Sequence, residues 1–223
     1  MTNIKGGVSY VIDHIPRTTR QRRPGTVRVP QTLTIHSTGN LTSTARDERL
    51  WLTNTANTNA HAGWHIVVDD REAIEAIPLN EVAWHAGDGA AGAGNRFSIG
   101  IEICESGDRT KTIDNVARVV AALLREYGLP LSSVRQHHEW NRKNCPRILR
   151  SNGLWQEFLE LVGRQLRPAT STNPLANAVA ILVEEGVIQS PEYWLEHAKP
   201  GRMPLGDFVA VLIVNAANRI RKP

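Results

Sequence analysis

The chain has 223 residues, of which 41% are hydrophobic and 22% charged, and its formal net charge is +4. These values are typical of a globular protein with one full-sized domain and room for a small second one. The apolar segment at residues 208–214 is too short to span a bilayer, so no membrane span is expected. With only two cysteines, Cys104 and Cys145, a disulfide framework is not expected.

The first 30 residues are rich in Arg, Pro and Gly and are predicted to be irregular. They lack the succession of basic, apolar and small residues that marks a signal peptide. We therefore expect synthesis in the cytoplasm and, if the protein acts outside the cell, release by another component. Four arginines in residues 17–23 indicate either a solvated arm or attraction to a polyanion, either nucleic acid or an anionic cell wall. No nucleic-acid recognition motif accompanies them, so no nucleic-acid partner is expected.

The next segments predict a strand and a helix. Residues 32–38 alternate with strong β-formers and predict a strand that ends at His36. Residues 43–57 predict a helix, because they open with Ser43 as a capping residue followed by acidic residues.

A hairpin and a loop are predicted after that helix. Residues 63–70 and 72–78 predict a β-hairpin with its turn near Asp70 and Arg71. Four glycines in residues 87–95 predict a loop.

Residues 98–104 predict a strand with two distinct faces. One face carries three isoleucines, and the other carries small or polar residues: Ile99, Ile101 and Ile103 against Ser98, Gly100, Glu102 and Cys104. Apolar residues at helical spacing then predict a helix that ends at Gly128, and residues 154–166 predict another amphipathic helix.

The remaining residues indicate a second, smaller domain. Residues 167–175 are rich in Pro, Thr and Ser and are predicted to be a linker after a domain at residues 1–166. Residues 176–223 form a predicted all-helical domain of three short helices, with helical patterns at residues 175–185, 191–197 and 205–220. About 50 residues supply only a minimal core.

The segment HHEWNRKNCP, residues 137–146, places His137 and His138 a short loop before Cys145. Ligation by cysteine and histidine favours Zn²⁺ over hard cations such as Mg²⁺. A catalytic zinc needs three protein ligands and one open position for water. His36 is the best third candidate because it ends an apolar strand, and the alternatives are His14, His61, His65, His85 and His197.

Glu102 lies between isoleucines in the strand at residues 98–104. A buried carboxylate is costly unless it is paired, so Glu102 either pairs with an arginine or lysine or serves as a general base of raised pKa beside zinc-bound water. Cys104 lies on the same strand face, and we expect it to be a small buried hydrophobe rather than an extra thiol near the metal.

Five segments occur in an order that resembles a known family: TIHST (34–38), WHIVVDD (64–70), AWHAGDG (83–89), GNRFSIGIEIC (94–104) and QHHEWNRKNCP (136–146). Over residues 10–165 the chain resembles the zinc-dependent N-acetylmuramoyl-L-alanine amidases of the type-2 amidase and peptidoglycan-recognition family. The likeness is greatest to endolysins and autolysins of phages and Gram-positive bacteria. It implies an α/β fold with a central mixed β-sheet flanked by helices.

The resemblance also implies roles for individual residues. Three residues match the zinc ligands: His36, His137 and Cys145. His138 is then a neighbour of the site. Glu102 and Lys143 match the catalytic pair, and His85, with Trp64 and His65, is expected in the substrate groove. Some relatives carry a catalytic tyrosine where this chain has Trp64, so Glu102 and Lys143 are expected to carry more of the mechanism.

The implied reaction is hydrolysis of the amide between N-acetylmuramic acid and L-alanine in peptidoglycan. The alternative is a peptidoglycan-binding protein of the same fold without catalysis, although such relatives typically lack the cysteine ligand. A regulator that binds nucleic acid or a partner protein is supported only by the arginines and the pI of about 9.4. Residues 176–220, with the segment SPEYW, resemble a helical module that follows many such amidases, which implies either a cell-wall-binding domain or an accessory packing domain.

Overall fold

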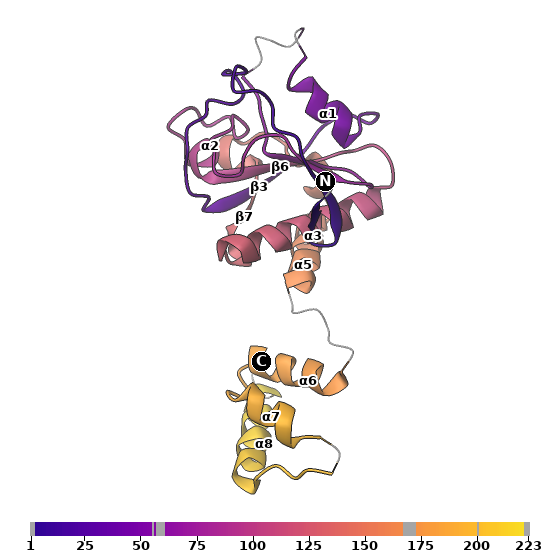
Figure 1. Cartoon of the computed structure of the whole chain (residues 1–223), viewed down its shortest axis with the longest axis vertical. Coiled ribbons are helices and arrows are strands. Elements are labelled where there is room, and N and C mark those ends of the chain that lie inside the picture. The colour runs from indigo at the N-terminus through magenta and orange to yellow at the C-terminus, as the bar shows by residue number, and fades with distance from the viewer. Residues whose placement is uncertain (1–2, 55, 57–60, 167–172, 200, 221–223) are drawn as a thin grey trace. The chain divides into compact units, whose positions relative to one another are not determined.

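The structure is a computed structural model that describes residues 3–54, 56, 61–166, 173–199 and 201–220 (Figure 1). It divides into two compact units, Met1–Leu166 and Arg167–Pro223. Among the described residues, no helix combines the length and apolar character needed to cross a membrane.

The first unit is built on a mixed seven-stranded sheet, in the order β1-β2-β5-β4-β6-β3-β7. The strands are β1 (Asn3–Lys5), β2 (Val8–Ile12), β3 (Thr32–Ser37), β4 (Ile66–Val68), β5 (Ala73–Glu75), β6 (Ser98–Ile103) and β7 (Val134–Gln136). Strands β4, β6, β3 and β7 run parallel, whereas the pairs β1/β2 and β4/β5 are antiparallel. The expected central mixed sheet is therefore confirmed.

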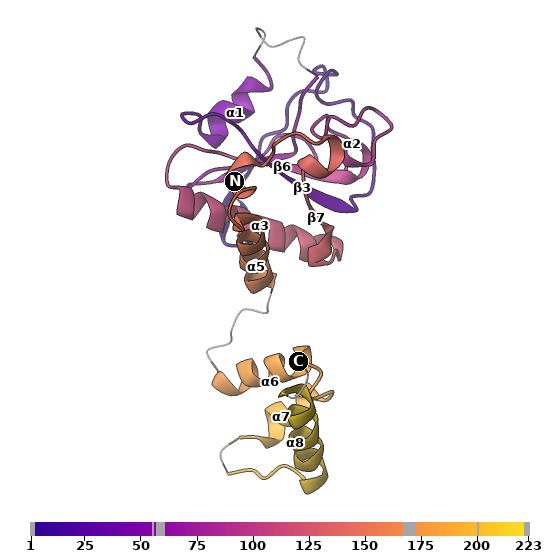
Figure 2. The same cartoon turned by 180° about the vertical axis from the view of Figure 1, so that it is seen from behind.

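Helices cover both faces of this sheet (Figures 1 and 2). They are α1 (Ala45–Trp51), α2 (Ala93–Phe97), α3 (Arg109–Tyr127), α4 (His138–Asn141) and α5 (Leu154–Leu166), with short 3-10 turns η2 (Leu131–Ser133) and η3 (Arg147–Leu149). Helices α3 and α5 bury the larger apolar cluster against one face of the sheet. Helix α1 packs over the other face with a smaller cluster.

The two-faced pattern of β6 is confirmed by these clusters. Ile99, Ile101 and Ile103 lie in the cluster under α3. Cys104 follows on the opposite side, where it is fully buried in the cluster with α1 and behaves as a small hydrophobe. Glu102 belongs to that same side of the sheet, which is the side that carries the polar groups of the site.

The first 30 residues are not wholly irregular as predicted, because β1 and β2 form an antiparallel hairpin. Its turn is Gly6-Gly7, and both residues have positive φ, at 61° and 82°. Paired glycines of this kind favour a tight hairpin turn, since they adopt positive φ without a steric penalty. The dipeptide was the available signal for this hairpin.

Two other predictions change at their boundaries. The predicted helix at residues 43–57 is α1, which ends at Trp51, and its N-cap is Thr44 in a capping box with Asp47. Ser43 was expected to cap the helix, but its hydroxyl binds the Glu48 carboxylate at 2.5 Å. The predicted glycine loop ends earlier than expected, because α2 begins at Ala93.

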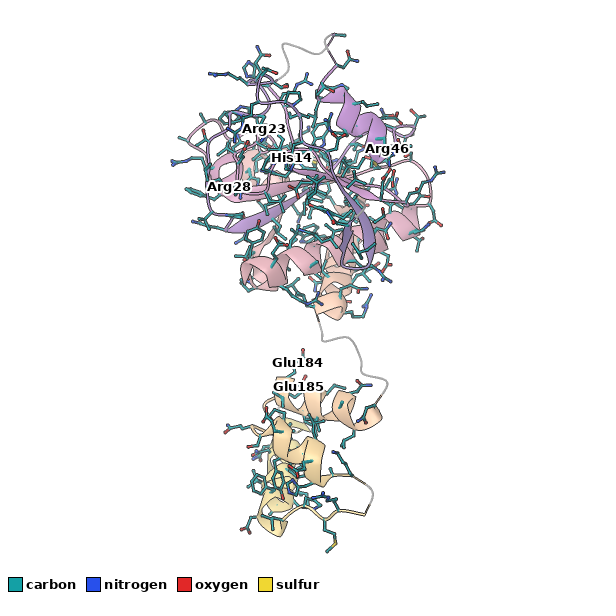
Figure 3. All side chains as sticks on the ribbon, viewed as in Figure 1. His14, Arg23, Arg28, Arg46, Glu184 and Glu185 are labelled. Atoms are coloured by element: carbon teal, nitrogen blue, oxygen red, sulfur yellow. The ribbon has the colours of Figure 1, made fainter. Side chains whose placement is uncertain are left out.

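The arginine-rich segment is partly built into the first unit. Arg23, labelled in Figure 3, forms two hydrogen bonds of 2.7 and 2.8 Å with the buried carboxylate of Glu81. Arg22 donates to the Trp51 carbonyl at 2.7 Å and lies over the Trp51 ring. The reading of a wholly solvated arm is therefore wrong for these two residues.

The second unit contains α6 (Pro174–Glu184), α7 (Pro191–His197) and α8 (Gly206–Ile220), which confirms the three predicted helical segments. Its core is small and comprises Val179, Val187, Ile188 and Trp194. Residues 167–172 of the predicted linker lie outside the described residues. Helix α6 begins within the range predicted for the linker, because Asn173 caps it by accepting from the Leu175 N–H.

Candidate metal centre and active site

The predicted ligands meet at the carboxyl ends of three neighbouring parallel strands. His36 is the penultimate residue of β3, and its register partner on β6 is Glu102. His137 directly follows β7, and its N–H donates to the Ile35 carbonyl at 3.3 Å. Ligand sites of α/β sheets form at this edge, where parallel strands bring their last residues together.

His36, His137 and Cys145 form a group whose donor atoms all lie within 4.8 Å of one another. The two Nδ1 atoms are 2.9 Å apart, and the Cys145 sulfur lies 3.8 Å from the Nδ1 of His36. Tetrahedral zinc bonds of about 2.1 Å to nitrogen and 2.3 Å to sulfur separate their donors by roughly 3.4–3.6 Å. These three donors therefore fit around one ion, whereas His138 is half-buried and directs its Nδ1 toward the Lys143 carbonyl.

The ring of His137 is oriented by the backbone. Its Nε2 lies 3.0 Å from the carbonyl oxygen of Ala86. A carbonyl only accepts, so Nε2 carries the proton and the neutral ring turns the lone pair of Nδ1 toward the other two donors. Metal-bound histidines commonly have such a partner on the second ring nitrogen.

The Cys145 thiol is set for ligation by a backbone donor. Burial raises its pKa to about 11, and a hydrogen bond from the Ser37 backbone N–H opposes that shift. The thiolate is the metal-binding form, and a bound cation favours it further. The residue is 4% exposed, which separates it from bulk solvent.

Glu102 is an unpaired carboxylate beside the three donors. Its Oε1 lies 4.0 Å from the Nδ1 of His36, and its Oε2 is buried without a hydrogen-bond partner among the described residues. Burial raises its pKa to about 8, Glu48 adds to the shift, and Lys143 opposes it. No described arginine or lysine pairs with it, which leaves a carboxylate free to exchange protons beside the site.

Lys143 is exposed on the loop before Cys145. Its charge lowers the pKa values of His36 and His137 and opposes the raised pKa of Glu102. Lys143 is thus an exposed cation whose field reaches the buried donor group.

Three residues predicted to line the substrate groove are buried instead. Trp64, His65 and His85 are each at most 8% exposed. Trp64 stacks on Trp51 in the core under α1. His65 accepts from the Gly100 N–H and donates to the Glu81 carbonyl. His85 lies behind His36, with its Nδ1 3.0 Å from the Nε2 of His36. Their predicted contact with substrate gains no support from this placement.

The glycine-rich loop predicted only as a loop has a role at the site. The carbonyl of Ala86, the residue just before it, accepts from His137, and the Oδ1 of buried Asn95 in the loop accepts from the N–H groups of both His85 and Ala86 at 2.8 Å. Asp88 in turn accepts from the N–H groups of Gly94 and Asn95. Sequence reasoning missed this support, although Asp and Asn are residues that fold short loops through side-chain bonds to the backbone.

Comparisons with known proteins point to one family. A family model described as N-acetylmuramoyl-L-alanine amidase matches residues 26–148. The chain is 38% identical over 164 residues to the N-acetylmuramoyl-L-alanine amidase CwlH of Bacillus subtilis, covering 73% of this chain and 64% of that protein. It is 33% identical over 224 residues to the amidase XlyA of the same species, covering 97% of this chain and 71% of that protein.

Solved structures are similar over the first unit. The catalytic domain of XlyA is 38% identical, with a TM-score of 0.65, and the match covers 70% of this chain and all of that one. A mutant endolysin from Bacillus subtilis is 37% identical, also with a TM-score of 0.65, over 70% of this chain and 99% of that one. The chain thus spans about two thirds of the length of the two curated relatives.

Proposed function

This chain belongs to the N-acetylmuramoyl-L-alanine amidase family, and on that premise we propose that it is a zinc-dependent peptidoglycan hydrolase. The bond cleaved is the amide between N-acetylmuramic acid and the L-alanine of the stem peptide. The observation that carries the proposal is the group of His36, His137 and Cys145 with the unpaired carboxylate of Glu102 beside it. Similarity to an endolysin supports a lytic role on the bacterial wall.

The donor set fits zinc better than other biological cations. A thiolate and two imidazoles are soft and intermediate donors, which Mg²⁺ and Ca²⁺ do not select. Three protein ligands leave one position of a tetrahedral ion open, as catalytic zinc sites do. Zinc held here would lower the pKa of a coordinated water and polarise the substrate carbonyl.

Glu102 and Lys143 supply the proton and charge chemistry. Because burial raises its pKa, the Glu102 carboxylate accepts a proton more readily than an exposed glutamate does, and it can return the same proton to the departing nitrogen. The Lys143 ammonium stabilises negative charge on the carbonyl oxygen as it becomes tetrahedral, a contribution of a few kcal/mol. Glu102 would act on the attacking water and Lys143 on the substrate carbonyl, at the coordination position that the three protein ligands leave open.

The second candidate is a wall-binding protein of this fold that does not catalyse. Two observations count against it: the cysteine donor is present, and no residue that the structure describes gives the Oε2 of the neighbouring carboxylate a hydrogen bond. A purely binding surface has no need of a buried, unpaired acid, which costs free energy.

The test is chemical analysis of digested wall. Purified peptidoglycan is incubated with the zinc-loaded protein, and the products are identified by mass spectrometry. We expect stem peptides with a free L-alanine amino terminus and glycan with free lactyl carboxyl groups, loss of both with a chelator, and their return with Zn²⁺. New reducing sugar ends, cleavage within the peptide, or no cleavage with zinc bound would refute the proposal.

For the second unit we propose wall binding. Its cavity of about 340 Å³ is lined by Trp194, Phe208, Val211 and Leu212 together with the polar side chains of Asp207 and Asn215. Apolar cavities with a few polar groups are the usual form of ligand sites. The match to XlyA extends over 97% of the chain and so includes this unit.

A further inference from the structure

A row of buried polar groups leads away from His36 on the side opposite the candidate ion. The Nε2 of His36 lies 3.0 Å from the Nδ1 of His85, and the Nε2 of His85 lies 3.0 Å from the carbonyl oxygen of Ser98. His36 and His85 are 2% and 8% exposed, so bulk water does not compete for these bonds.

The carbonyl at the end of the row decides where the protons lie. It only accepts, so the Nε2 of His85 donates, and the Nδ1 of the neutral His85 ring must accept. The facing Nε2 of His36 is therefore protonated, and the lone pair of His36 lies on Nδ1.

We propose that His85 is a positioning residue for the metal centre, which holds the His36 ring in the orientation and tautomer that present Nδ1 to zinc. The inference rests on the proposed zinc function. With both rings fixed, the lone pairs of the His36 and His137 Nδ1 atoms face each other at 2.9 Å with no proton between them. A cation relieves that repulsion, so the network prepares the site before the ion arrives.

The scaffold around His85 is built to hold its ring. A Cβ on Gly100 of β6 would lie 2.5 Å from the Cγ of His85, so only glycine at this strand position admits the ring. The His85 N–H is fixed by Asn95, and the Ser98 carbonyl also accepts from buried Arg28 at 3.0 Å. A second donor on that carbonyl keeps it in place behind His85.

The experiment compares replacements that keep or remove the acceptor. In His85→Asn, the Oδ1 stands where Nδ1 was and accepts from His36, whereas His85→Leu has similar bulk and no acceptor. The zinc dissociation constant of the full chain is measured at fixed pH by competition with a chromophoric chelator. We expect His85→Leu to bind zinc about 10–100-fold more weakly and His85→Asn to stay within about threefold of the parent protein. Cobalt(II) absorption spectra report whether the coordination geometry changes with the affinity.

Controls separate positioning from packing. His14→Leu removes another hydrogen-bonded histidine, one paired with Glu75 away from the site, and should leave zinc affinity unchanged. Gly100→Ala keeps every ligand but displaces the ring, so it should weaken zinc binding as His85→Leu does. If His85→Leu fails to fold, His85→Gln takes its place, because its oxygen lies one bond too far out to replace Nδ1.

The outcomes also distinguish this inference from the proposed function. A parent protein that binds no zinc refutes the zinc centre itself. The positioning role is overturned if the parent protein binds zinc and the affinity is unchanged in His85→Leu, or in His85→Gln where that variant takes its place. Equal losses in His85→Asn and His85→Leu would show that packing, not the hydrogen bond, supports the site.

Discussion

At the scale of single residues, the candidate site contains one carboxylate that has no hydrogen-bond partner for one of its oxygens among the described residues. Glu102 is aligned with His36 by the register of β3 and β6, and its Oε2 meets no donor among the described residues. We expect Glu102→Gln to lower turnover on purified wall by about 10²–10⁴-fold, since the amide cannot take the proton. Zinc content, measured by atomic emission, should be unchanged because the ligands remain.

The matched control for that variant is Glu126→Gln, which changes an exposed carboxylate that pairs with Lys5. It should leave turnover unaltered. If the Glu102→Gln protein retains more than a tenth of the parent activity, Glu102 is not the general base.

The three candidate ligands could be chosen from the sequence, but the orientation of their side chains could not. Spacing before Cys145 and the strand-end position of His36 indicate the candidate donors among the eight histidines and two cysteines, and the family resemblance selects His137 over His138. The structure brings His36, His137 and Cys145 together. The sequence does not say which ring nitrogen faces the ion, because that depends on the carbonyls of Ala86 and Ser98. The sequence likewise predicts His85 in the substrate groove. Its position behind His36 is visible only from the contact between the two rings in the structure.

At the scale of elements, local signals predicted most segments, and the errors arose at their ends. Helix α3 has the predicted stop, because Gly128 lies in the left-handed region at φ 63° and donates to the carbonyls of Leu124 and Arg125. The hairpin of β1 and β2 was missed because its strands are short and mostly polar or exposed, so alternation alone does not mark them. Tertiary pairing with β5 stabilises β2 beyond its own propensity.

Two glycine substitutions should change stability in opposite directions. Gly128→Ala should lower the free energy of unfolding by about 1 kcal/mol, because alanine is strained at positive φ although no atom lies within 4 Å of its Cβ. Gly163→Ala in α5 should raise it by about 0.4–1 kcal/mol, since the nearest atom is the Leu131 Cδ2 at 3.6 Å and alanine favours the helix. Urea unfolding of both variants measures the effects, and equal signs would contradict the backbone argument.

At the scale of the whole molecule, the mixed sheet was predicted but its strand order was not, since pairings such as β3 with β7 join segments about 100 residues apart.

One property of the assembled first unit follows from its four buried histidines. Burial lowers the pKa of His85 to about 3 and of His137 to about 4, and the pKa values of His36 and His65 fall well below 6.5. These groups stay neutral in the folded state at pH values where the unfolded chain protonates them.

Acid should therefore destabilise the metal-free protein. Below pH 6.5 the unfolded state binds the additional protons, and each such histidine costs up to about 1.4 kcal/mol per pH unit. Glu102 and Glu48 act in the opposite sense, because their raised pKa values add stability as the pH falls toward 4.5. We expect a net loss on the order of 2–3 kcal/mol per pH unit below 6.5 in urea unfolding with a chelator present. If the free energy of unfolding is constant from pH 6.5 to 5, the histidines are not held neutral by burial. Excess zinc should shift the loss of stability to lower pH, because it binds the folded state.

The two units should separate catalysis from attachment. Each has its own apolar core, so residues 1–166 are expected to fold without residues 167–223. On a soluble muramyl peptide, the shortened protein should keep the kcat/KM of the full chain, because His36, Glu102 and Cys145 all lie in the first unit. On intact wall, loss of the second attachment should lower apparent affinity by roughly 10²-fold, since a tethered binding unit raises the local concentration of the catalytic one. Chromatography of the cleaved muramyl peptide measures kcat/KM, and pelleting with purified wall measures the apparent affinity. Trp194→Ala in the full chain tests the cavity of the second unit directly. Equal binding of the short and full proteins to wall would assign the helical unit a role other than attachment.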